Sequence, residues 1–143
     1  KKVHHQFYST ELKFYRRSGR MSGAAAAIGT VLGICPIMRL DDKGRIIAYD
    51  KVRGKKNAVA RTVETMKCHA ENGENYSGKA FICHSNCLAD AKATKAAVEA
   101  AFPHLNSEVR ICDIGTIVAS HSGPGTVAVF FFGDDRAPEG SPV

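Results

Sequence analysis

The residues best suited to chemistry stand together near the end of the chain, in the stretch SHSGPGT. His121 and Ser122 can donate hydrogen bonds to an oxygen anion. Gly123 and Gly125 allow the backbone to approach a ligand closely, and Pro124 stiffens the loop. Taken alone, the stretch is interpreted either as a ligand-binding loop or as a turn between two buried segments.

The same stretch also raises the possibility of nucleophilic catalysis. Such catalysis needs a serine activated by a nearby base and a third group that orients that base. Neighbouring residues on one strand point to opposite faces, so a pair formed by His121 and Ser122 is geometrically poor. An acyl-transfer or phosphatase-like enzyme that uses these two residues is retained as the alternative function.

Two groups of cations stand beside expected helix starts. Arg20 precedes a helix expected to begin at Ser22, and the partial positive charge of a helix N-terminus next to an arginine suits a carboxylate or phosphate. Arg53, Lys55 and Lys56 stand at another helix start, where the helix dipole disfavours cations, and broken local rules often mark function. For both groups, solvated surface charge is the competing interpretation.

Sulfur and imidazole side chains form a third group, with Cys68 and His69 followed by Cys83, His84 and Cys87. The spacing Cys-x3-Cys lies within the range of zinc sites. However, Cys83 stands in an apparent strand interior, where it would be a small buried hydrophobe, and Cys68 has no clean second pair. No metal is therefore expected, and a zinc-binding module is only a third possibility.

The elements that must position these residues alternate between helical and strand patterns. We expect a short helix from Ser9 or Thr10 to about Arg17, closed by Gly19, and a second helix from Ser22. Strands are expected over residues 34–40, 45–52 and 79–84, and amphipathic helices over 59–70 and 88–102. Extended or buried segments are expected over 107–115, 116–120 and 126–133, although the last could equally be a buried helix. This order implies a two-layer α/β domain with a mixed sheet and helices on one face.

The totals bound the class of protein. The 143 residues fit a single domain, with residues 134–143 as a flexible tail. The net charge of +6 suits an anionic ligand or an acidic partner protein, but it lacks the basic stripe of nucleic-acid binding. The longest apolar run, residues 24–28, is too short to span a bilayer, and no signal peptide is apparent. Reduced thiols and a cytoplasmic location are expected.

Three segments together resemble the carboxyl-terminal domain of the DegV family, the bacterial fatty-acid-binding proteins. They read ELKFYRRSGRMSGAAAAIGTVLGICPIMRLDDKGRI, KVRGKKNAV and IGTIVASHSGPGTVAVFFFG, and they follow the family's order across residues 8–133. The resemblance implies a two-domain protein with a fatty acid held between the domains, and an amino-terminal domain absent from this chain. It assigns Arg20, His121 and the Ser122 hydroxyl to the site that binds the fatty-acid carboxyl group. Gly123, Pro124 and Gly125 would support the loop that carries His121 and Ser122.

The resemblance further implies a non-enzymatic carrier with no cofactor, whose ligand is a long-chain fatty acid. Some relatives deliver that ligand to a fatty acid kinase subunit, which phosphorylates the carboxylate, and the region that matches Arg53 docks the kinase. Two departures concern the head-group contacts: SGR replaces the commoner GGR before the second helix, and Cys35 stands where many relatives have lysine.

Overall fold

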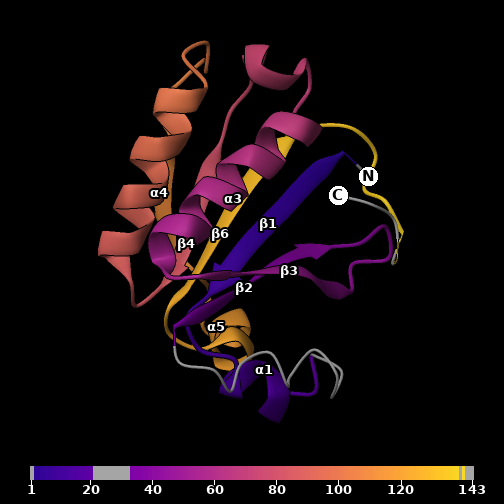
Figure 1. Ribbon diagram of the computed structural model, residues 1–143, viewed down its shortest axis with the longest axis vertical. Coiled ribbons are helices and arrows are strands. Elements are labelled where there is room, and N and C mark those ends of the chain that lie inside the picture. Colours follow the sequence, from indigo (N-terminus) through magenta and orange to yellow (C-terminus); the bar gives the residue numbers. More distant parts are fainter. Residues whose placement is uncertain (1, 21–32, 139, 141–143) are drawn as a thin grey trace.

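A six-stranded mixed sheet organises the computed structural model, which describes residues 2–20, 33–138 and 140 (Figure 1). The strands run in the order β3-β2-β1-β6-β4-β5. All neighbouring pairs are antiparallel except β4 and β5, which are parallel. The strands are β1 (Val3–Ser9), β2 (Ile34–Leu40), β3 (Ile46–Arg53), β4 (Phe81–Ser85), β5 (Arg110–Asp113) and β6 (Thr126–Phe132).

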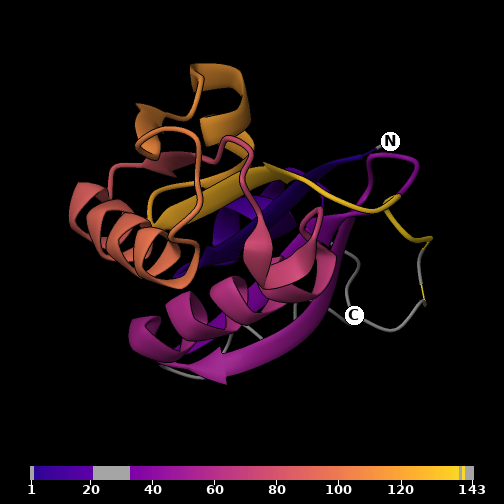
Figure 2. The same ribbon diagram turned by 90° about the horizontal axis from the view of Figure 1, so that it is seen from above.

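The two long helices, α3 (Lys55–His69) and α4 (Leu88–Ala101), cover one face of this sheet (Figure 2). Two short helices, α1 (Lys13–Arg17) and α5 (Thr116–Ser122), contact each other beyond one end of the strands (Figure 1). A 3-10 turn, η2 (Gly73–Asn75), follows α3. The expected two-layer α/β architecture, with the long helices on one face, is therefore confirmed.

Alternation along the strands divides the core between the two faces of the sheet. Under α3 and α4, Tyr8 of β1 and Val129 of β6 join a cluster with Met66 and Val98 of the helices. The neighbouring strand residues pack on the opposite face, in a smaller cluster that contains Phe7, Leu12, Tyr15, Met38 and Ala128. Among the described elements, no long helix covers the smaller cluster, and a cavity lies on this face.

Several expected elements need correction. Residues 116–120 are helical in α5, although an extended or buried segment was expected. The central strand β1 has no counterpart among the expected elements, and Ser9 ends it rather than capping a helix. Helix α1 begins at Lys13 with Leu12 as its N-cap, and Gly19, at φ 66°, follows its end as expected. The helix expected from Ser22 lies outside the described residues.

The remaining long segments agree with their patterns, since the expected strands over 34–40, 45–52 and 79–84 correspond to β2, β3 and β4. The first residues of the expected tail lie against the sheet, because the Arg39 guanidinium donates hydrogen bonds to the carbonyls of Ala137 and Pro138 at 2.8 and 3.1 Å. Among the described residues, no helix has the length and apolar character that crossing a bilayer requires.

Candidate functional site

The face of the sheet opposite α3 and α4 holds a mainly apolar cavity of about 360 Å³. Its floor comes from alternate residues of the strands and its wall from α5 and the segment before it. The lining residues are His5, Phe7, Tyr15, Leu40, Ile46, Ile114, Val118, Ser122, Thr126, Ala128 and Phe130. A volume of this size lies within the usual range for small-molecule sites.

Helix α5 leaves apolar side chains in solvent beside this cavity. Ile117 is 78% exposed and Val118, which lines the cavity, is 60% exposed. Exposed apolar residues at the rim of an apolar cavity typically mark a surface that a ligand or another part of a protein covers. The face of the sheet that holds this cavity is therefore the surface of the described domain best suited to an apolar ligand.

One end of the cavity borders a buried polar cluster, in which hydroxyl groups from distant segments meet. The Thr126 hydroxyl lies 3.1 Å from Ser9 Oγ and 3.2 Å from the Ser122 carbonyl, and Ser9 Oγ in turn donates to the Glu11 carbonyl at 3.0 Å. Thr126 directs its single proton at one of these acceptors, so the Tyr15 phenol, at 3.2 Å, donates to Thr126. Burial raises the pKa of Tyr15 to about 12, which keeps the phenol a neutral donor.

The Ser122 hydroxyl is the unsatisfied member of this polar end. Its Oγ is buried and has no hydrogen-bond partner among the described residues. It lies near enough to the Tyr15 phenol to favour the ionised form of that group, but without the geometry of a hydrogen bond. A buried hydroxyl without a partner costs about 1–3 kcal/mol, so its presence at the cavity wall needs an explanation.

The same observation bears on catalysis. Because Ser122 Oγ has no partner among the described residues, no base is placed to activate it. His121 and Ser122 are the last two residues of α5 and do not lie on a strand. Adjacent positions on a helix do not face each other, so the His121 and Ser122 side chains are poorly arranged for catalysis on a helix, as they would be on a strand.

Arg20 and His121 come to one corner of the domain through Ser18. The Ser18 hydroxyl donates to the His121 carbonyl at 3.3 Å across 103 positions of sequence, and Arg20 Nη1 donates to the Ser18 carbonyl at 3.1 Å. Arg20 is exposed and His121 is half-buried, and neither lines the apolar cavity. Of the three residues expected at the carboxyl site, only Ser122 lines the cavity, and the head-group role of Arg20 and His121 remains a prediction.

The turn after α5 requires glycine at two positions. Gly123 and Gly125 have φ values of 75° and 81°, in the region that favours glycine. A Cβ atom at Gly123 would lie 2.3 Å from Cδ2 of Phe14, and one at Gly125 would lie 2.1 Å from Oγ1 of Thr10. The Gly125 N–H also donates to the Ser85 carbonyl at 2.8 Å, so the turn is fixed between the start of α1 and the end of β4.

The basic group at the start of α3 is partly neutralised. Arg53 is the last residue of β3 and is exposed, and Gly54, with φ 80°, forms the N-cap of the helix. Lys55 Nζ lies 2.7 Å from Oδ2 of Asp90 on α4, while Lys56 is exposed. The position of Arg53 at an exposed edge strand is compatible with contact to a partner, and its docking role remains a prediction.

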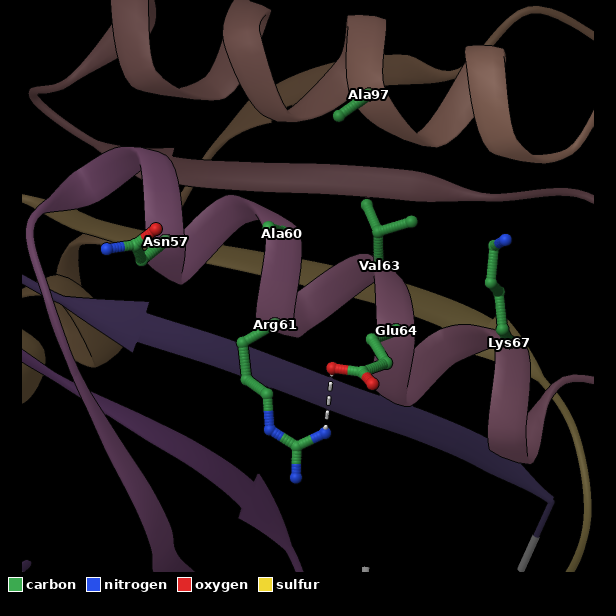
Figure 3. A pocket seen from close by; sticks show the side chains of 7 residues that line it. All are labelled: Asn57, Ala60, Arg61, Val63, Glu64, Lys67 and Ala97. Atoms are coloured by element: carbon green, nitrogen blue, oxygen red, sulfur yellow. Dashed lines mark hydrogen bonds and ion pairs between the residues drawn. The ribbon is translucent and has the colours of Figure 1, made fainter.

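A second hollow, of about 540 Å³, lies on the outer surface of α3 and α4 (Figure 3). Its polar side chains are paired with one another or with their neighbours: Arg61 contacts Glu64 at 3.4 Å and Asp50 at 2.7 Å, and Lys67 contacts Glu74 at 2.7 Å. Figure 3 shows no set of donors or acceptors that converges on the hollow. We therefore regard the cavity on the opposite face as the candidate site.

Within the described ranges, the sulfur groups near β4 do not come together as a set of metal ligands. His84 Nδ1 accepts the Cys87 N–H at 3.3 Å, and Cys87 Sγ donates to the Thr126 carbonyl at 3.3 Å. Burial raises the pKa of the Cys83 and Cys87 thiols, which disfavours the thiolate that a metal needs. Among the described residues, these side chains belong to no group of three metal-binding side chains.

Residues 1–134 match the family model described as "Uncharacterised protein, DegV family". The chain belongs to the DegV family. A DegV domain-containing protein of Clostridium perfringens is 33% identical over 137 residues, which cover 96% of this chain and 46% of that protein. The chain thus spans about half the length of the curated DegV relatives that it matches.

Solved DegV structures have the same fold. The structure of a fatty-acid-binding DegV family protein from Thermus thermophilus has a TM-score of 0.77 and 26% identity, over 93% of this chain and 46% of that one. The fatty acid kinase (Fak) B3 protein of Streptococcus pneumoniae, loaded with linoleic acid, has a TM-score of 0.80 over 93% of this chain and 45% of that one. Its identity is 16%, so it shows the fold alone.

Two features of this DegV site could not be found from the motif that suggested it. Tyr15 and Ser9 contribute hydroxyls to the polar end, but they precede Thr126 by 111 and 117 positions. The one signal in the sequence is that Tyr15 stands in the segment ELKFYRRSGR, which carries part of the family resemblance.

Proposed function

We propose that this chain contributes half of a fatty-acid-binding site in a non-enzymatic carrier. The observation that carries the proposal is an apolar cavity bordered by a buried hydroxyl, Ser122 Oγ, to which the described part of the chain supplies no hydrogen-bond partner. Each buried methylene contributes about 0.8 kcal/mol to binding, so an acyl chain needs no specific chemistry, whereas a carboxylate needs donors that offset its loss of water. DegV structures that bind fatty acids support this choice of ligand.

In the proposed complex, the acyl chain lies on the apolar residues of β1 and β6, including Phe7 and Ala128, and the carboxylate lies at the hydroxyl end. The Ser122 hydroxyl donates to one carboxylate oxygen. Arg20 and His121, joined at the same corner through Ser18, supply further donors and positive charge at the mouth.

A second domain completes the proposed site. The exposed Ile117 and Val118 beside the cavity are the surface that such a domain would bury. DegV relatives are about twice as long as this chain, which supports an amino-terminal domain as the covering part. A long acyl chain held between two domains is shielded from water on both sides.

We further propose that the carrier presents the carboxyl group to a fatty acid kinase subunit, with Arg53 at the docking surface. Support comes from the likeness in fold to the Fak B3 protein and from the exposed cations Arg53 and Lys56 at the start of α3. Cations at the rim of an interface act mainly on the rate of encounter with an acidic partner. Among residues 2–20, 33–138 and 140, no base is hydrogen-bonded to Ser122 Oγ, which favours the carrier over the enzymatic alternative.

Native mass spectrometry of the full-length protein tests the proposal directly. We expect a co-purified fatty acid, and tighter binding of a free acid than of its methyl ester, because the ester cannot present a carboxylate to Ser122. Absence of bound lipid together with no measurable affinity for long-chain acids would refute the carrier. Equal affinity for acid and ester would refute the carboxyl site while leaving the apolar cavity in place.

A further inference from the structure

Three distant segments meet beside β1, on the side of the sheet that carries α3. They are the start of β1 at His4, the end of α3 at His69, and Asp134 just after β6. The Asp134 N–H donates to the His69 carbonyl at 3.0 Å, and the Gly133 N–H donates to the Lys2 carbonyl at 2.9 Å. A Cβ atom at Gly133 would lie 2.0 Å from the His69 carbonyl oxygen, so the segments are in close backbone contact. The backbone therefore positions these side chains before any ligand binds.

The side chains converge on one point. His4 Nε2 lies 2.8 Å from Asp134 Oδ1, and His69 Nδ1 lies 3.0 Å from Asp134 Oδ2. One ligand atom from each residue lies within 4.8 Å of the other two. Bonds of about 2.0–2.1 Å to a tetrahedral zinc ion put ligand atoms about 3.3 Å apart. Small side-chain movements would therefore bring the three atoms to coordination distances.

We propose that His4, His69 and Asp134 form a site for a divalent transition metal of the zinc class, with a fourth position open to water. Imidazole nitrogen and carboxylate oxygen are both common zinc ligands, and three protein ligands with one open position make a recurrent arrangement. The side chain of His4 is 6% exposed whereas that of Asp134 is 57% exposed, so the ion reaches the site from solvent on the Asp134 side.

The surroundings of the cluster suit a metal. The Asp134 carbonyl accepts a hydrogen bond from His4 Nε2 at 3.0 Å, so coordination requires that this ring proton moves to Nδ1 and leaves Nε2 free for the ion. The ion pairs of Asp134 among the described residues are both with these histidines, so no lysine or arginine competes there for its carboxylate. Stacking of the His4 ring on Phe131, with centroids 5.1 Å apart, holds that imidazole in place.

The metal would act as a clasp on the fold. It would join the start of the central strand, the end of a long helix and the segment after β6. Because the metal would bind the folded state and not the unfolded state, it would raise the free energy of unfolding. His4 lies on the opposite face of β1 from His5 and Phe7, which line the apolar cavity. The metal site is thus separate from the proposed fatty-acid site, and either can fail without the other.

Cobalt binding to the full-length, metal-stripped protein tests the site, because Co²⁺ reports its coordination in its visible spectrum. With thiols kept reduced, we expect one equivalent bound, a d–d absorption of low coordination number, no thiolate charge-transfer band, and a Tm that rises with Co²⁺ concentration. Asp134→Asn should weaken binding at least about tenfold, since even the loss of a residue that only orients a ligand costs about 10–100-fold.

Three variants test whether the cluster binds the metal. Asp134→Asn changes an exposed group and keeps an oxygen acceptor, and His69→Asn provides a second ligand deletion if the first protein does not fold. His104→Asn changes an exposed histidine outside the cluster and should bind cobalt as the parent does. Parent-like affinity in a folded Asp134→Asn or His69→Asn protein, a thiolate spectrum, or no binding by the parent protein would overturn the proposal.

Discussion

Replacing Ser122 with alanine should move stability and ligand affinity in opposite directions. The Ser122 hydroxyl is buried and has no hydrogen-bond partner in the described ranges of the chain, so its removal relieves a desolvation cost of about 1–3 kcal/mol and breaks none of the hydrogen bonds described above. The free energy of unfolding without ligand should therefore stay the same or rise by about 1 kcal/mol. A serine-to-alanine change in a ligand-binding site is seldom expected to raise the free energy of unfolding.

Affinity for a fatty acid should fall in the same variant. A hydrogen bond to a charged group contributes about 1.5–3 kcal/mol, which corresponds to a loss of roughly 10- to 150-fold in affinity. The affinity for the methyl ester should change little, because the lost donor serves the carboxylate. A hydroxyl with a merely structural role would give neither the loss nor its dependence on the carboxylate.

The assay is titration calorimetry on delipidated full-length protein, paired with urea unfolding of the ligand-free form. Ser120→Ala is the matched control: it removes an exposed hydroxyl from the same helix, one that donates to the Ile117 carbonyl, and it should leave affinity unchanged. Unchanged affinity for the acid in a folded Ser122→Ala protein would refute the reasoning. A catalysed reaction in the parent protein that the variant loses by orders of magnitude would instead favour the enzymatic alternative.

Four further outcomes are expected. His121→Ala should remain folded but lose about 1–3 kcal/mol of fatty-acid affinity, and parent-like lipid occupancy in a folded variant would contradict its role. Arg53→Glu should leave lipid content unchanged and slow kinase association most at low salt, and equal lipid phosphorylation at all salt concentrations would count against docking. Gly125→Ala should lower the free energy of unfolding by at least about 1–3 kcal/mol, because its Cβ would clash with Thr10 at φ 81°, and a parent-like Tm would show that the turn relaxes. Burial raises the pKa of Tyr15 to about 12 in the folded state, against 10.0 in model compounds, so the unfolded state loses its phenol proton at a lower pH than the folded state does. The free energy of unfolding should therefore fall between pH 10 and 12. Urea unfolding of Tyr15→Phe should show a smaller fall over the same pH range.

Much of the fold could be predicted because its long elements have strong periodicity. The failures have local causes. Strand β1 buries His4 and Gln6, so polar residues occupy its covered face and hide the usual alternation; Gln6 is tolerated there because the Tyr49 hydroxyl donates to its side chain at 3.0 Å. In α5, Ile117 and Val118 have high β-propensity, yet the segment is helical and leaves both in solvent.

The candidate site could be predicted only in part for a similar reason. The motif identified Ser122 and the glycines whose conformation the turn requires, since these stand together in sequence. It could not identify Tyr15, which reaches Thr126 across 111 positions, or the convergence of His4 with His69 and Asp134. Such contacts depend on the strand order, and no local pattern in the sequence encodes it.

The central position of β1 has a consequence for how the protein is made. One edge of strand β1 pairs with β2, which ends at Leu40. The other edge pairs with β6, from Ser9↔Thr126 to Val3↔Phe132. During synthesis, one edge of β1 therefore stays unpaired until almost the whole described chain has been translated. Pairing across so long a separation is slow, and an open strand edge invites pairing with another chain. Nascent chains should therefore depend on chaperones most strongly in the interval before β6 emerges from the ribosome.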